Sequence, residues 1–202
     1  MIFPLFASFI VFTIWLTYEI GKHNRIDEAV NQEFWRKEHR ANRVRRKSLD
    51  DLEYITIPYD ILPMHILQDD EQVSEYKEIL NSLSDSKIVN FTGITNTDLK
   101  LKYGAPNIDL LSKYDQNYTV LARTLNKWAA YVYEKGYPKE ARDILEFAVS
   151  TKTDVSGSYK LLCQIYKEEN TPEKIKELYP VAESVNSIMK NTIFHILQEA
   201  EQ

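Results

Sequence analysis

The residue types that most often carry chemistry are scarce in this sequence and widely separated. None of the four histidines belongs to an HExxH motif or to a comparable pair of metal ligands: His23, His39, His65 and His195. With five glycines in the whole chain, no glycine-rich loop that would hold a phosphate can be written. We therefore predict neither a metal site nor a cofactor-binding site.

Nucleophiles and carboxylate pairs lead to the same conclusion. Cys163 is the only cysteine, so no intramolecular disulfide forms. It occupies a small position in a helical pattern described below, which predicts a buried, unreactive thiol. The neighbouring carboxylates Asp69 and Asp70 are more simply helix caps than catalytic groups. No catalytic residue is predicted, and the chain is not expected to be an enzyme.

The composition favours a folded, mainly helical chain. Glycine (5) and proline (7) are both rare, which argues against a β-rich fold with many tight turns. The apolar fraction of 44% is sufficient to build a packed core, so extensive disorder is not expected.

The N-terminal segment is predicted to be a transmembrane anchor, residues 1–20. No charged side chain occurs from Met1 to Tyr18, and eighteen residues are close to the shortest helix that crosses a bilayer. Trp15 and Tyr18 suit an interfacial aromatic belt. A cleaved signal peptide is the main alternative, but no basic side chain precedes the run and no convincing cleavage site follows it. A buried core helix is a further alternative.

Basic residues beside the anchor predict its orientation. None precedes the apolar run, whereas nine follow it between Lys22 and Lys47. The expected topology is a single-pass protein of the cell membrane, with its N-terminus outside and its C-terminal domain in the cytoplasm.

Charge divides the chain into a basic neck and an acidic body. Up to Lys47 there are 9 basic and 5 acidic residues, whereas 16 basic and 25 acidic residues follow. Apolar residues at helical spacing predict a juxtamembrane helix over residues 21–48. Its basic residues either contact anionic lipid or only fix the topology; the predicted lipid-contacting residues are Arg36, Lys37, Arg40, Arg43, Arg45, Arg46 and Lys47. Nucleic acid is not expected, because the body is acidic and no aromatic residues interleave with the basic run.

The middle of the chain is predicted to connect the neck to a helical domain. Residues 49–68 contain Pro58 and Pro63 and should form an extended strap whose apolar residues pack against the body: Ile55, Ile57, Ile61 and Leu62. Residues 69–121 should be the helical N-terminal part of the soluble domain. Within it we expect a helix capped by Asp69 or Asp70, and two short helices over 98–103 and 108–114.

The strongest pattern is an internal repeat with a period of 34 residues. Its first set is Leu125, Trp128, Ala129, Val132, Gly136, Ala141, Leu145 and Ala148. The second set is Tyr159, Leu162, Cys163, Tyr166, Asn170, Ile175, Tyr179 and Ala182. Large residues match large ones, small residues match small ones, and the paired turn positions Gly136 and Asn170 both tolerate positive φ.

This pattern resembles the tetratricopeptide repeat (TPR), a helix-turn-helix unit with W-x₂-L-G-x₂-Y in its first helix and A-x₃-F in its second. The sequence departs from it at Ile175, where alanine is usual, and at Thr153 and Ser187, where a proline often stands. The resemblance implies an all-α, α-solenoid domain with repeat 1 at 122–155, repeat 2 at 156–189 and a capping helix at 190–202. The cap's polar residues are expected on its outer face: Lys190, Asn191, Gln198 and Glu199.

A longer stretch carries a second resemblance. The runs NFTGITNTDLKLKYGAPN and LLSKYDQNYTVLARTLNKWAAYVYEKGYPKEA are similar to a family of single-pass, membrane-anchored proteins of Gram-positive bacteria. The resemblance extends from the anchor to the last helix. It implies the same architecture and no particular activity.

The first helices of successive repeats are expected to line a concave groove. The residues predicted to face it are Arg123, Asn126, Lys127, Tyr133, Lys160, Gln164 and Lys167. Four of them are cations, which favours a partner protein with an acidic peptide or a C-terminal carboxylate. The alternative is an ordinary solvated helix face. The sequence thus predicts a membrane-tethered protein–protein interaction adaptor; the alternative is a structural, membrane-surface protein whose neck binds anionic lipid and whose repeats self-associate.

Overall fold

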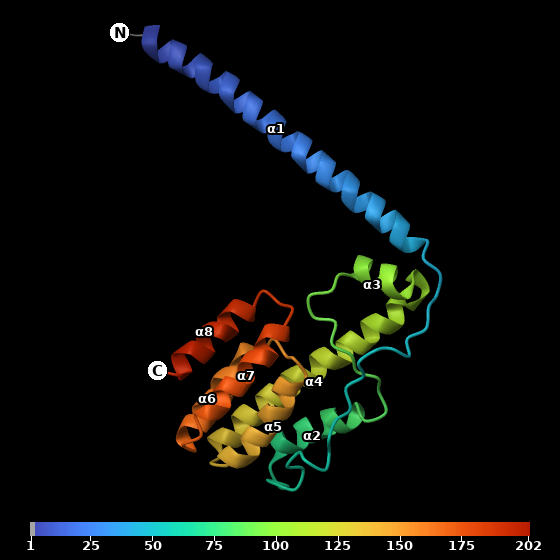
Figure 1. The fold of residues 1–202 in the computed structure, drawn as a ribbon, viewed down its shortest axis with the longest axis vertical. Helices are drawn as coiled ribbons and strands as arrows, with labels where there is room; N and C mark the ends of the chain where they lie inside the picture. Colours follow the sequence, from blue (N-terminus) through green and yellow to red (C-terminus); the bar gives the residue numbers. More distant parts are fainter. Residues whose placement is uncertain (1–2) are drawn as a thin grey trace. The chain divides into compact units, whose positions relative to one another are not determined.

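The computed structural model describes the backbone of residues 3–202, and the side chains of that range except 3–7, 23–27 and 29. The predicted all-α class is confirmed, because the described residues contain helices and no strands (Figure 1). The elements in chain order are α1 (Phe3–Asn42), α2 (Glu71–Ser82), α3 (Asn96–Tyr103), a short 3₁₀ helix (Ala105–Asn107), α4 (Ile108–Glu134), α5 (Pro138–Ser150), α6 (Ser156–Glu168), α7 (Glu173–Ser184) and α8 (Lys190–Ala200).

The chain divides into two compact units. Unit 1 comprises residues 1–47 and 96–106, and unit 2 comprises 48–95 and 107–202. In unit 1, α3 packs against the C-terminal end of α1. The carboxylate of Glu38 accepts a hydrogen bond from Thr97 Oγ1 at 2.7 Å and forms an ion pair with Lys100. Lys37 pairs with Asp98 at 2.7 Å, so residues about sixty positions apart hold this unit together.

The predicted anchor and juxtamembrane helix lie in one continuous helix, α1, which ends at Asn42 rather than at residue 48. No proline occurs between Pro4 and Pro58, and a single interior glycine such as Gly21 costs only about 1 kcal/mol. Beyond Asn42 the backbone bonds instead to the segment around α3, through Lys47 N to Tyr103 O and Ala105 N to Val44 O. No helix is long and apolar enough to cross a membrane within the described part of the chain. The predicted anchor includes residues 1–7, whose side chains lie outside that part.

The core of unit 2 is built from helices α2 and α4 to α8, together with apolar residues of the strap. Seven pairs of positions in the 34-residue repeat lie in helices. Tyr179 is half-buried, and each of the other residues in these pairs is at most 3% exposed. The eighth pair, Gly136 and Asn170, follows α4 and α6 with φ of +86° and +57°. Both turns therefore use the left-handed conformation, which glycine and asparagine tolerate best.

Helix α4 is longer than the sequence analysis predicts. It runs unbroken through Ile108–Glu134, so the predicted short helix at 108–114 and the predicted start of repeat 1 at residue 122 fall within one element. No glycine or proline interrupts this range, and Tyr114, Tyr118 and Leu121 continue its buried face. The polar residues at 115–119 lie within the helix and do not form a loop.

The strap packs as predicted at Ile57 and Leu62, which are buried, but the prediction is wrong at Ile61, which is 63% exposed.

Of the two predicted caps, Asp70 is the one that caps α2: its Oδ1 accepts hydrogen bonds from the backbone N–H groups of Gln72 and Val73 at 3.1 and 3.2 Å. Its Oδ2 binds Tyr131 Oη at 3.0 Å and Lys135 Nζ at 3.2 Å. Asp70 therefore joins α2 to α4 in unit 2.

These bonds make the stability of unit 2 sensitive to acid. Partial burial opposes ionisation of Asp70, but the hydrogen bonds from Val73, Lys135 and Tyr131 outweigh it and lower its pKa. A carboxylate with a lowered folded-state pKa stabilises the fold above its unfolded pKa of about 4, and this contribution is lost as the pH falls through the folded value.

We expect the difference in unfolding free energy between the native chain and Asp70→Asn to be largest near neutral pH and to shrink in acid. Urea unfolding followed by far-UV circular dichroism measures it. Asp69→Asn is the matched control, because Asp69 caps no helix in the described structure. A pH-independent difference for Asp70→Asn would show that the charge of Asp70 is not what stabilises the cap.

Candidate functional site

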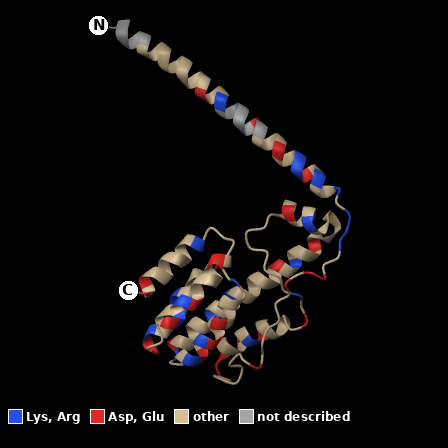
Figure 2. Cartoon of the chain, viewed as in Figure 1, with Lys and Arg blue, Asp and Glu red and all other residues tan. Residues whose placement is uncertain are grey.

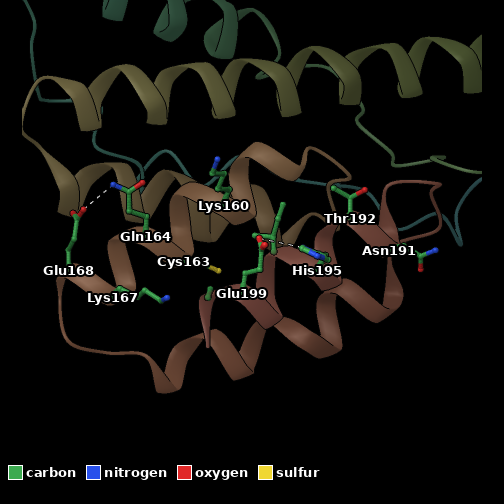
Figure 3. A pocket seen from close by; sticks show the side chains of 11 residues that line it. Lys160, Cys163, Gln164, Lys167, Glu168, Asn191, Thr192, His195 and Glu199 are labelled. Carbon is green, nitrogen blue, oxygen red and sulfur yellow. Dashed lines mark hydrogen bonds and ion pairs between the residues drawn. The ribbon is translucent and has the colours of Figure 1, made fainter. Parts of the chain in front are cut away.

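A groove of about 940 Å³ lies between α6 and α8 in unit 2 (Figure 3). Its volume lies in the range of about 300–1,000 Å³ typical of ligand sites. Apolar side chains from both helices form its base: Cys163, Ile196 and Ala200. Charged and polar side chains surround them: Lys160, Gln164, Lys167, Glu168, Asn191, Thr192, His195 and Glu199.

Helix α6 contributes one wall as a stripe of side chains. Lys160, Gln164 and Lys167 stand at positions i, i+4 and i+7, which places them on one face of a helix. All three are exposed, and the two lysines are two helical turns apart, about 10.5 Å along the axis. In the described part of the chain, neither lysine side chain has a hydrogen-bond or ion-pair partner. Both charges are therefore available to an external group.

Gln164 is fixed in place by a network that reaches back to α4. Tyr133 Oη donates to Glu168 Oε1 at 2.6 Å, and Gln164 Nε2 donates to the same Oη at 2.8 Å and to Glu168 Oε1 at 3.0 Å. The hydrogen bond to Glu168 raises the pKa of Tyr133, and the same bond lowers the pKa of Glu168. Glu168 thus stays ionised and engaged with its own chain.

Helix α8 contributes the opposite wall. His195 and Glu199 are one turn apart, with Nδ1 of the histidine 3.4 Å from Oε2 of the glutamate. In Figure 3 they face the side chains of α6 with Cys163 between the two rows. Burial raises the pKa of the Cys163 thiol to about 11, so the sulfur at the base of the groove is protonated at neutral pH. The two walls therefore differ: α6 carries two lysines without a partner and Glu168, whose Oε1 is already engaged, whereas α8 carries Glu199.

The seven residues predicted to face a groove are not all brought together. Lys160, Gln164 and Lys167 line it, and Tyr133 supports Gln164 from α4. Asn126 instead packs α4 against α6, where its Oδ1 accepts a hydrogen bond from Ser158 Oγ at 3.1 Å.

The remaining two predicted groove residues, Arg123 and Lys127, are exposed on α4 and do not line the groove. Sequence analysis missed the wall formed by α8, since it assigned Asn191 and Glu199 to the outer face of a cap. Their spacing of eight residues, with His195 between them, is the signal that could have placed them on a common face.

The predicted lipid-contacting residues also separate into two sets. Lys37 pairs with Asp98, Arg46 Nη2 donates to Pro106 O at 3.3 Å, and Lys47 Nζ donates to Leu101 O at 3.2 Å. Figure 2 shows the basic residues along the end of α1 and in the segment after it. All seven side chains are exposed, and the second set consists of those that make no hydrogen bond or ion pair among the described residues: Arg36, Arg40, Arg43 and Arg45.

The length of α1 bears on these exposed arginines. Arg36 follows Tyr18 by eighteen residues, which is about 27 Å along a helix axis. Charges attract each other only weakly beyond the Debye length of about 8 Å at physiological salt. If Tyr18 stands at the headgroups of a bilayer that α1 crosses, these arginines are too far away to bind that surface. Lipid contact would require α1 to lie along the membrane.

Comparisons with protein-family models, curated proteins and solved structures find no match for this chain. Among the described residues, no group of three or more histidine, cysteine, aspartate or glutamate side chains is placed to hold a metal ion. The groove between α6 and α8 is therefore judged on its own geometry.

Proposed function

We propose that this chain is a membrane-tethered protein–protein interaction adaptor, and that a segment of its partner binds in the groove between α6 and α8. The observation that carries the proposal is the groove itself: an apolar base with two lysines beside it that have no partner in the described structure. Apolar contacts would supply affinity, and the charges would select the partner. The groove holds no nucleophile paired with a base, so binding rather than catalysis is its proposed role.

The repeat pattern supports a TPR-like module. Helices α4 and α5 form one closely packed pair. Helices α6 and α7 are the next pair in sequence, with α6 packed mainly against α5 and α8, and α7 mainly against α8. Positions 34 residues apart are buried at equivalent places in both pairs, as in a stack of similar units. Such stacks bind extended surfaces of other proteins along the helices that line one side.

The tether is proposed to be the apolar start of α1, residues 1–20, with its N-terminus outside and residues 21–202 in the cytoplasm. The uncharged run from Met1 to Tyr18 and the basic residues after it support this topology. Phe9, Val11 and Ile14 are 62–66% exposed on α1, as lipid-facing side chains would be. Tethering would raise the local concentration of the groove for partners at the same membrane.

Site-specific photo-crosslinking of the 202-residue chain in the membranes of the cell that makes it tests this proposal. A photoreactive residue at Thr192, inside the groove, should crosslink a partner protein. The same residue at Gln198, which is exposed on α8 but does not line the groove, is the matched control. Combining the Thr192 probe with Ile196→Glu, which puts a charge into the apolar base, should abolish the adduct.

A different pattern would favour the structural alternative. The exposed arginines Arg36, Arg40 and Arg43 are the observation on which that alternative depends. If probes at Thr192 and Gln198 crosslinked equally well, and only to lipid or to a second copy of the chain, the groove would have no part in the function. If a chain without residues 1–20 then bound liposomes of anionic lipid, and charge reversal of Arg36, Arg40 and Arg43 released it, the membrane-surface role would be established.

A further inference from the structure

We infer that the groove between α6 and α8 binds an amphipathic helix of the partner, acidic along the one flank that faces α6. The inference deepens the proposed function and depends on it. It rests on three features of the groove: the spacing of its free lysines, the size of the side chains at its base, and the charge on its opposite wall.

The spacing of Lys160 and Lys167 favours a helix over an extended peptide. The two lysines are about 10.5 Å apart along α6. In a partner helix lying along α6, carboxylates at i and i+7 are separated by the same distance as the two lysines and lie on one face of the helix. In an extended peptide, side chains on one face recur every two residues, at about 6.7 or 13.4 Å, and neither distance matches. A helix can therefore present one carboxylate to each lysine.

The base of the groove suits the apolar stripe of such a helix. Cys163 lies between the two lysines in sequence, at i+3 from Lys160, and Ala200 lies on α8. Both side chains are short, so an incoming helix can approach closely. Ile196 supplies a larger apolar surface beside them. Apolar residues at i+1, i+4, i+5 and i+8 of the partner helix are centred about 100° around its axis from carboxylates at i and i+7, so they can cover this base while the carboxylates face α6.

The opposite wall restricts where the partner carries acid. Glu199 is exposed on α8 with His195 as its neighbour at 3.4 Å, so a carboxylate brought to that wall is repelled. Glu168 lies on the α6 side, but its Oε1 already accepts from Tyr133 and Gln164. Lys160 and Lys167 are thus the groups left to attract a charge. A helix acidic on one flank fits, because one of its two directions along the groove turns that flank to α6, whereas a helix acidic on both flanks does not fit.

Peptide binding to the 202-residue chain in nonionic detergent tests the inference. The probe is an alanine-based helical peptide of about 15 residues with glutamate at i and i+7 on one flank of a leucine stripe at i+1, i+4, i+5 and i+8. A second peptide of the same composition carries its glutamates at i+3 and i+10, roughly opposite the leucine stripe, so they point away from the groove. Fluorescence anisotropy should show that the first peptide binds at least about tenfold more tightly, a difference that two charge-assisted contacts readily supply.

Two double variants identify the charges responsible. The double variant Lys160→Glu/Lys167→Glu should bind the first peptide about tenfold or more weakly. It should instead bind a peptide with lysines at i and i+7. Arg123→Glu with Lys127→Glu makes the same change in net charge on exposed residues of α4 outside the groove, and should leave binding almost unchanged.

The inference is overturned if both glutamate peptides bind equally, if neither binds, or if the two double variants lose the same affinity. The proposed function is separable from it. A partner crosslinked from Thr192 but not from Gln198, with no preference for the first peptide, would keep the groove as a binding site and reject the one-sided acidic helix.

Discussion

Trp128→Ala is expected to lower the unfolding free energy of unit 2 by about 3–5 kcal/mol, a large part of the total stability of an ordinary domain. Trp128 is fully buried in α4, at the second position of the 34-residue repeat. Removing its indole deletes the contacts of the largest buried side chain and leaves a cavity that rigid helices close only in part. Urea unfolding of the 202-residue chain in nonionic detergent, followed by far-UV circular dichroism, measures the change.

Two further variants show which property of the indole matters. Trp128 Nε1 is a buried donor without a hydrogen-bond partner in the described structure. Trp128→Phe keeps an aromatic ring and removes that donor, so it should cost clearly less than Trp128→Ala. Lys127→Ala, at the exposed neighbouring position, should change stability by less than about 0.5 kcal/mol. A Trp128→Ala variant as stable as Lys127→Ala would mean that the repeat positions do not form the core.

The parts of unit 2 that sequence analysis predicts best are those fixed by local pattern. Helical periodicity places the buried positions of α4 to α7, and Gly136 and Asn170 show where two of the turns occur, because positive φ restricts the residue type. Asp70 is predictable as a cap for the same kind of reason. The length of α4 is missed because the polar run at 115–119 resembles a loop, although it contains no residue that stops a helix.

The candidate site is only half predictable because it depends on how two helices face each other. Lys160, Gln164 and Lys167 follow from the periodicity of α6 alone. The contribution of His195 and Glu199 depends on which side of α8 turns toward α6, and packing decides this. The same limit applies to unit 1, where α3 contacts α1 across a long stretch of sequence.

Gly104 carries the second large expected effect, because it lets the segment after α3 approach the end of α1. Its φ is +96°, and a Cβ there would lie 2.2 Å from the backbone oxygen of Arg45. Backbone atoms cannot move aside cheaply, so Gly104→Ala must disturb the adjoining hydrogen bonds from Lys47 N to Tyr103 O and from Ala105 N to Val44 O. Together with the strained φ, this should destabilise the packing of α3 on α1 by about 2 kcal/mol or more.

Hydrogen exchange of the 202-residue chain, read by mass spectrometry, locates that loss. Amides of α3 should exchange at least about thirtyfold faster in Gly104→Ala, since each 1.4 kcal/mol is a factor of ten, while the amides of α4 to α8 keep their native rates. Gly136→Ala is the matched control: its φ is +86°, but a Cβ there would meet nothing within 4 Å, so only the backbone strain of about 1 kcal/mol applies. If α3 kept its protection in Gly104→Ala, the close approach to Arg45 would not be what holds α3 on α1. If both variants lost protection throughout unit 2, the two units would unfold as one.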